Sequence, residues 1–77
     1  MLILYVKNGC PYCHKVLSLG EDLDITFDLK NSMDTAITAE LIARGGKCQV
    51  PYLVDSDRNV EMYESDDIIA YLQEHYT

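Results

Sequence analysis

The sequence predicts an α/β protein in which four strands form one mixed sheet flanked by three helices. A continuous apolar run at residues 2–6 is typical of a strand buried on both faces. Further along the chain, segments with apolar residues at helical spacing alternate with short apolar runs, and turn-forming residues separate them. The predicted order is βαβ followed by αββα. With only 77 residues, the chain is expected to form a single domain, residues 1–77.

The first half of the chain predicts a strand, a helix and a second strand. Leu2–Val6 form the first strand, and the helix runs from Pro11 to about Leu23, with Gly20 as a close-packing position. Residues Ile25–Leu29 then alternate apolar and polar side chains, as a strand does. A strand, a helix and a strand within about thirty residues imply a parallel, right-handed crossover.

The second half begins with a helix whose apolar positions include Ile37 and Leu41. Asn31, Ser32 or Asp34 can cap this helix, and a Gly45-Gly46 pair ends it. Its remaining apolar positions are Ala36 and Ile42.

A hairpin and a last helix complete the pattern. Val50–Val54 predict a strand with Pro51 at its beginning, and a turn cluster leads to a short return strand at Val60–Met62. The chain closes with a helix over Glu64–His75. Four of its apolar side chains are expected to face inward: Ile68, Ile69, Leu72 and Tyr76.

Composition excludes several classes of partner. A net charge of −7 argues against nucleic acid and anionic membrane surfaces. No apolar run approaches the length of a membrane span, and no cationic leader is present. Three cysteines, two of them in one motif, do not form a disulfide framework, which favours a reducing compartment. We therefore expect a soluble, cytoplasmic monomer.

The motif that carries chemistry is Cys10-Pro11-Tyr12-Cys13, directly after the first strand. Pro11 suits the first position of a helix, so Cys10 falls at the N-cap, in front of unpaired backbone N–H groups. A thiolate is stabilised there, and its pKa falls below that of a free thiol. Cys13 lies one turn deeper. The spacing therefore predicts that Cys10 attacks a disulfide and that Cys13 resolves the product.

A metal site is the alternative reading of the two cysteines. Zinc requires four ligands, and only Cys48, His14 and His75 remain as candidates, none of them in a second paired motif. We therefore expect no metal. Cys48 is interpreted as a partly buried bystander, and His14 as a residue of the helix surface.

With Lys7 three residues before the first cysteine, the motif resembles that of a dithiol glutaredoxin. Val50-Pro51 and Glu64-Ser65-Asp66-Asp67 extend this resemblance over nearly the whole chain. Glutaredoxins usually carry Gly-Gly before the acidic pair, whereas Tyr63-Glu64-Ser65 here is similar to the N-terminal domain of glutathione transferases, as is the segment 45–55. The resemblance implies a thioredoxin-like fold in its minimal, glutaredoxin-like form.

The resemblance also implies a glutathione site with glutathione as co-substrate. It implies a cis Val50-Pro51 bond, with the Val50 backbone pairing with the cysteinyl unit. Ser65 caps the last helix and receives the α-carboxylate of the γ-glutamyl group, and Asp66 accepts from its α-amino group. Lys7 faces the glycine carboxylate and Tyr12 packs against the tripeptide. The implied set is Lys7, Tyr12, Val50, Pro51, Glu64, Ser65 and Asp66.

We therefore expect a glutathione-dependent thiol–disulfide oxidoreductase. It would reduce glutathionylated proteins and protein disulfides through Cys10 and Cys13. Two alternatives stay open. One is a small redoxin that is recharged by a thioredoxin reductase and donates electrons to ribonucleotide reductase; the other is a carrier of metal or iron–sulfur clusters.

Overall fold

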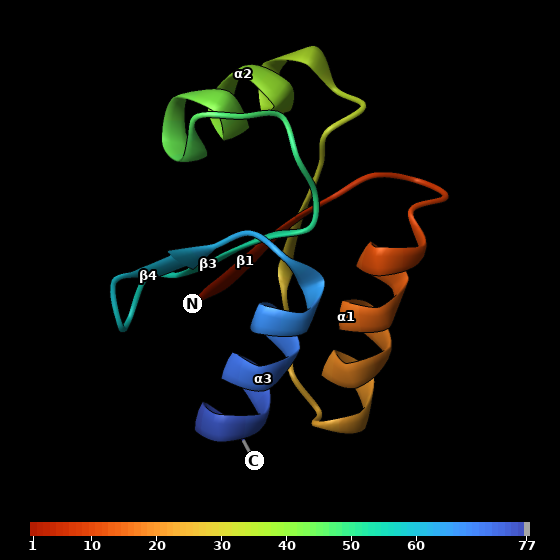
Figure 1. Ribbon diagram of the computed structural model, residues 1–77, viewed down its shortest axis with the longest axis vertical. Coiled ribbons are helices and arrows are strands. Elements are labelled where there is room, and N and C mark those ends of the chain that lie inside the picture. The colour runs from red at the N-terminus through yellow and green to blue at the C-terminus, as the bar shows by residue number, and fades with distance from the viewer. Residues whose placement is uncertain (77) are drawn as a thin grey trace.

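The computed structural model describes residues 1–76 and places one four-stranded sheet between helices on its two faces (Figure 1). The strand order is β2-β1-β3-β4. Strand β1 pairs parallel to β2 and antiparallel to β3, and β4 pairs antiparallel to β3. The predicted α/β fold and its order of elements are confirmed. In chain order the elements are β1 (Leu2–Val6), α1 (Pro11–Asp22), β2 (Asp28–Asn31), α2 (Thr35–Gly45), β3 (Tyr52–Asp55), β4 (Val60–Met62) and α3 (Ser65–His75).

Alternation along β1 divides the core between the two faces of the sheet. On one face, where α1 and α3 lie side by side in Figure 1, the main cluster contains Leu2, Leu4, Val6, Cys13, Val16, Leu53, Ile68 and Leu72. On the other face α2 adds Leu41 to a cluster with Tyr5, Tyr52 and Val54. Among residues 1–76, no helix is long and apolar enough to cross a membrane.

Helix α2 is joined to the sheet by a tyrosine of β1. The hydroxyl of Tyr5 donates to Glu40, whose carboxylate also lies 2.9 Å from the Lys30 ammonium. Burial and this bond raise the pKa of Tyr5 to about 12. Only Leu41 of the expected apolar positions is buried, and Ile42 is 44% exposed. Asp34 is the cap of α2, and Gly46 ends the helix in the left-handed conformation with φ of 92°.

Two strands begin later than the sequence predicts. The N–H of Ile25 donates to the carbonyl of Gly20 at 2.7 Å, so the chain is still folded against the end of α1 and joins β1 only from Asp28. Ile25 and Phe27 instead pack against the core. The predicted close packing of Gly20 is present, because a Cβ atom there would lie 2.5 Å from the Phe27 ring. Strand β3 likewise begins at Tyr52, after Pro51.

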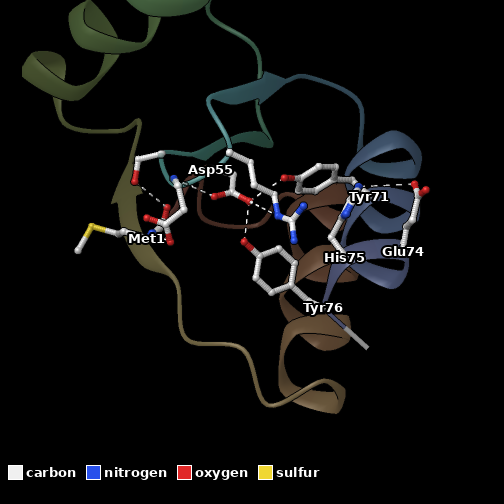
Figure 2. Close-up of polar contacts among 9 residues, drawn as sticks. Met1, Asp55, Tyr71, Glu74, His75 and Tyr76 are labelled. Atoms are coloured by element: carbon white, nitrogen blue, oxygen red, sulfur yellow. Dashed lines mark hydrogen bonds and ion pairs between the residues drawn. The ribbon is translucent and has the colours of Figure 1, made fainter.

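The end of the sheet farthest from the cysteine motif is held by a buried carboxylate (Figure 2). Asp55 is fully buried at the end of β3 and accepts hydrogen bonds from the hydroxyls of Tyr71 at 2.7 Å and Tyr76 at 2.6 Å. Burial alone would raise the pKa of Asp55, but these donors lower it below its ordinary value. The carboxylate therefore fixes the C-terminal part of α3 against the hairpin.

Candidate active site

Cys10 is the N-cap of α1, as the sequence predicts. Strand β1 ends at Val6, and Gly9 turns the chain with φ of 77°, a conformation that side chains rarely allow. Cys10 is extended, and Pro11 begins the helix. The backbone N–H of Cys13 donates to Cys10 Sγ at 3.4 Å. The sulfur therefore sits at the positive end of the helix, where a thiolate is favoured.

The two thiols differ strongly in acidity. Partial burial opposes ionisation of Cys10, but donors from Cys13 and Tyr12 and the charge of Lys7 outweigh it, so the pKa of Cys10 is lowered. Burial of Cys13, which is 2% exposed, and its hydrogen bond to Cys10 raise the pKa of Cys13 to about 11. Cys10 is therefore the more acidic thiol of the pair, and Cys13 the less acidic one.

The residues predicted to bind glutathione are divided between two hollows. The first, which we call the proline hollow, has a volume of about 400 Å³ and is lined by Tyr12, Val50, Pro51, Glu64, Ser65 and Asp66. The second, which we call the edge groove, has a volume of about 830 Å³ and contains Lys7, both cysteines, Leu17, Leu29 and Asn31. The structure thus brings six of the seven predicted residues together and places Lys7 with the cysteines.

The start of α3 differs in detail from the expectation. Val50-Pro51 is a cis peptide bond, as the resemblance implies. Ser65 does not cap the helix, because it is already the first helical residue; Glu64 occupies the cap position with φ of 70° and no side-chain cap bond is formed. The Ser65 side chain is nearly buried, at 7% exposure. The side chain at the cap position therefore leaves the first backbone N–H groups of α3 uncapped. This start of the helix lines the proline hollow, beside Pro51.

Gln49 is a lining residue of the proline hollow that sequence reasoning left unassigned. Its Nε2 donates to Glu64 Oε1 at 3.0 Å and so ties the segment before Pro51 to the start of α3. The sequence signal that could have identified Gln49 is its position directly before Val50. The ammonium of Lys15, a residue that lines the edge groove, lies 3.4 Å from Asp66 and 6.0 Å from the centre of the Tyr12 ring.

Cys48 lies outside both hollows, whereas His14 lines the edge groove. Cys48 is exposed rather than partly buried, because it follows the end of α2 in a loop segment. His14 is exposed on α1, as expected. Among the described residues 1–76, no group of three or more His, Cys, Asp or Glu side chains is arranged to hold a metal ion.

Two known proteins are similar to this chain in sequence or in structure. Glutaredoxin 3 of Escherichia coli (strain K12) is 33% identical over 51 residues, which span 65% of this chain and 61% of that protein. The crystal structure of a glutathione S-transferase from the Antarctic clam Laternula elliptica matches 97% of this chain with a TM-score of 0.82 and 32% identity. This chain covers 35% of that transferase.

A third comparison concerns the fold alone. A thioredoxin-like protein of known structure matches 96% of this chain over 97% of its own length, with a TM-score of 0.80 and 17% identity. The fold is therefore thioredoxin-like.

The model of the glutathione S-transferase N-terminal domain family matches residues 4–77, nearly the whole sequence. The chain belongs to the glutathione S-transferase N-terminal domain family, and its Cys10-Pro11-Tyr12-Cys13 motif resembles that of a dithiol glutaredoxin.

Proposed function

We propose that this protein is a glutathione-dependent thiol–disulfide oxidoreductase that acts on glutathione mixed disulfides and on protein disulfides. The observation that carries the proposal is the opposite shift of the two thiols, lowered for Cys10 and raised to about 11 for Cys13. An attacking thiol with a low pKa beside a protonated resolving thiol is the arrangement that thiol–disulfide exchange requires. A supply of reduced glutathione is needed, so we place the reaction in the cytoplasm.

The first reaction needs Cys10 alone. Its thiolate attacks the glutathione sulfur of a mixed disulfide, the S–S bond breaks, and the released protein thiolate takes up a proton. Cys10 is then joined to glutathione. A second glutathione thiolate attacks the glutathionyl sulfur, which forms oxidised glutathione and returns Cys10 to its thiolate form.

The proline hollow is proposed to hold the γ-glutamyl end of glutathione. The α-carboxylate of this end would accept from the uncapped N–H groups at the start of α3 and from the Ser65 hydroxyl. The Asp66 carboxylate would accept from the α-amino group, and the Val50 backbone would pair with the cysteinyl unit as an added strand does. Lys7, beside Cys10 in the edge groove, would face the glycine carboxylate.

Turnover of a glutathione–cysteine mixed disulfide tests the proposal directly. With glutathione, glutathione reductase and NADPH, the wild-type protein should consume NADPH, and Cys10→Ser should not. Cys48→Ser is the matched control, because it removes an exposed thiol outside both hollows and should keep full activity. Absence of turnover by the wild type, or activity in Cys10→Ser, would overturn the proposal.

A second candidate is conjugation of glutathione to an electrophile, favoured by the family match over residues 4–77. This reaction uses the thiolate of bound glutathione rather than Cys10. Conjugation of an electrophilic aryl halide that survives in Cys10→Ser, without disulfide turnover by the wild type, would decide for this candidate.

A further inference from the structure

The edge groove extends well beyond the cysteines. A further hollow of about 380 Å³ shares Leu17 and Leu29 with the edge groove and adds the apolar side chains of Ile25 and Phe27. The two hollows together follow α1 and β2 away from Cys10. Of the seven residues assigned to glutathione only Lys7 lines this surface, so the rest of the surface can receive a different ligand.

Strand β2 offers its backbone to such a ligand. It is the outer strand of the sheet, and in the described chain it pairs only with β1. Alternation directs Lys30 to Glu40 of α2, whereas Leu29 and Asn31 line the groove. Leu29 is 52% exposed, although it is a large aliphatic residue. An open edge with an apolar row beside it is suited to an extended peptide, which adds as a further strand.

Charge specifies the peptide. The chain carries 13 acidic residues and a net charge of −7, yet none of the residues that line the edge groove beside the cysteines is acidic. This part of the lining contains Lys7, His14 and Lys15. Of these residues, Lys15 forms an ion pair with Asp66. The proline hollow, by contrast, contains Glu64 and Asp66. An acidic residue appears in the groove only at its far end, at Glu21.

We propose that the edge groove binds the extended segment of a protein substrate on which the target disulfide lies, and selects a segment with an acidic residue next to the cysteine followed by an aliphatic one. The acidic residue faces Lys7, and the aliphatic side chain contacts Leu17 and Leu29. This inference rests on the proposed function and names its protein-substrate class. The γ-glutamyl end of glutathione and the protein segment then occupy different hollows beside Cys10, and the glycine carboxylate of glutathione and the acidic residue contact Lys7 in separate steps of the cycle.

Glutathione supplies the two electrons that reduction of the peptide disulfide requires. Cys10 thiolate attacks one sulfur of the peptide disulfide, the S–S bond breaks, and the released peptide thiolate takes a proton from water. Cys13 then loses its proton and attacks Cys10 Sγ, which releases the second peptide thiol, protonated in turn, and leaves a Cys10–Cys13 disulfide. Two glutathione molecules reduce this disulfide and leave as oxidised glutathione.

Two peptides test the selection. Each carries an intramolecular disulfide, with Asp and Leu beside the cysteines in one and Lys and Leu in the other. We expect a higher kcat/KM for the acidic peptide in the glutathione-coupled assay. The net charge of −7 alone predicts the reverse preference, so the result distinguishes the groove from the overall field of the protein.

Leu29→Asp and Ile42→Asp form the matched pair of variants. Both replace a half-exposed aliphatic residue and change the net charge equally, but only Leu29 lies in the groove. Leu29→Asp should lower the acidic-to-basic ratio of kcat/KM by about fivefold, the upper range for one exposed charge contact. Ile42→Asp should leave the ratio unchanged. Equal ratios in the two variants, or no preference in the wild type, would overturn the proposal.

Two further readouts separate the possible failures. The wild type and Ile42→Asp should turn over the glutathione–cysteine mixed disulfide equally; loss of that reaction in the wild type refutes the proposed function, not only the groove. In a Cys13→Ser, Cys48→Ser background, the acidic peptide can be trapped on Cys10 as a mixed disulfide. Amide exchange at residues 28–31 should then slow, and unchanged exchange there would contradict docking on β2.

Discussion

The two ends of the sheet stabilise an anion by the same physics and use it differently. Cys10 at one end and Asp55 at the other both have lowered pKa values, because hydrogen-bond donors outweigh the cost of burial. Cys10 borders an open groove, whereas Asp55 is fully buried and closed off by two tyrosine hydroxyls. Access to the anion, rather than its stabilisation, therefore distinguishes a reactive site from a structural one.

Within the cysteine end, Cys13→Ser should have the largest effect. Reduction of a protein disulfide should fall by at least about a hundredfold, because the resolving thiol acts at a high effective concentration from one helical turn away. Turnover of a glutathione mixed disulfide should persist, since that cycle uses only Cys10. Parallel assays with the two substrates measure the difference. Equal loss of both activities would show that the roles of the cysteines are assigned wrongly.

At the opposite end, Asp55→Ala should lower the free energy of unfolding by about 3 kcal/mol, because two part-buried hydroxyls lose a charged acceptor. Urea unfolding followed by circular dichroism measures this. Asp57→Ala is the control: its carboxylate forms only an exposed ion pair, with the Met1 ammonium at 2.6 Å, and the loss should be much smaller. Catalytic rates well below the unfolding midpoint should be unchanged in both variants. A stable Asp55→Ala protein would remove the structural half of the comparison.

The cysteine end could be predicted from sequence because its geometry is local. Pro11 at the first helical position and the three-residue spacing of Cys10 and Cys13 determine where the sulfurs lie. The continuous apolar run of β1 likewise predicts a strand buried on both faces, and its side chains enter the clusters on both faces of the sheet. These features need no information about distant segments.

The features that were missed depend on contacts between distant residues. The Gln49–Glu64 bond joins residues 15 apart, and the bonds from Tyr71 and Tyr76 to Asp55 join residues 16 and 21 apart. The start of β2 depends on where it meets β1, not on its own alternation. The placement of Lys7 in the edge groove is of the same kind, because only the folded chain places β2 beside the cysteines.

For the proline hollow we expect a smaller effect than for either of the first two variants. Ser65→Ala and Asp66→Ala should each lower kcat/KM for glutathione by about tenfold, the cost of one charge-assisted contact. Asp67→Ala is the control, because it changes an acid on the same turn of α3 that does not line the hollow. The coupled assay at varied glutathione concentration measures this. Normal kinetics in both variants would mean that these residues only begin a helix.

The smallest expected effect concerns Lys7, whose charge is the weakest of the main influences on the pKa of Cys10. Alkylation of reduced Cys48→Ser protein should accelerate as pH rises through the pKa of Cys10, below that of a free thiol, because the thiolate is the reactive form. Cys13, with its pKa near 11, does not interfere. Lys7→Ala should move this midpoint upward, and Cys13→Ala should move it further, because it removes a direct hydrogen bond. Salt should reduce the Lys7 effect and spare the other, since only exposed charges are screened. A free-thiol midpoint in the wild type would contradict the role of Cys10, and a larger shift for Lys7→Ala would show that charge, rather than hydrogen bonding, activates it.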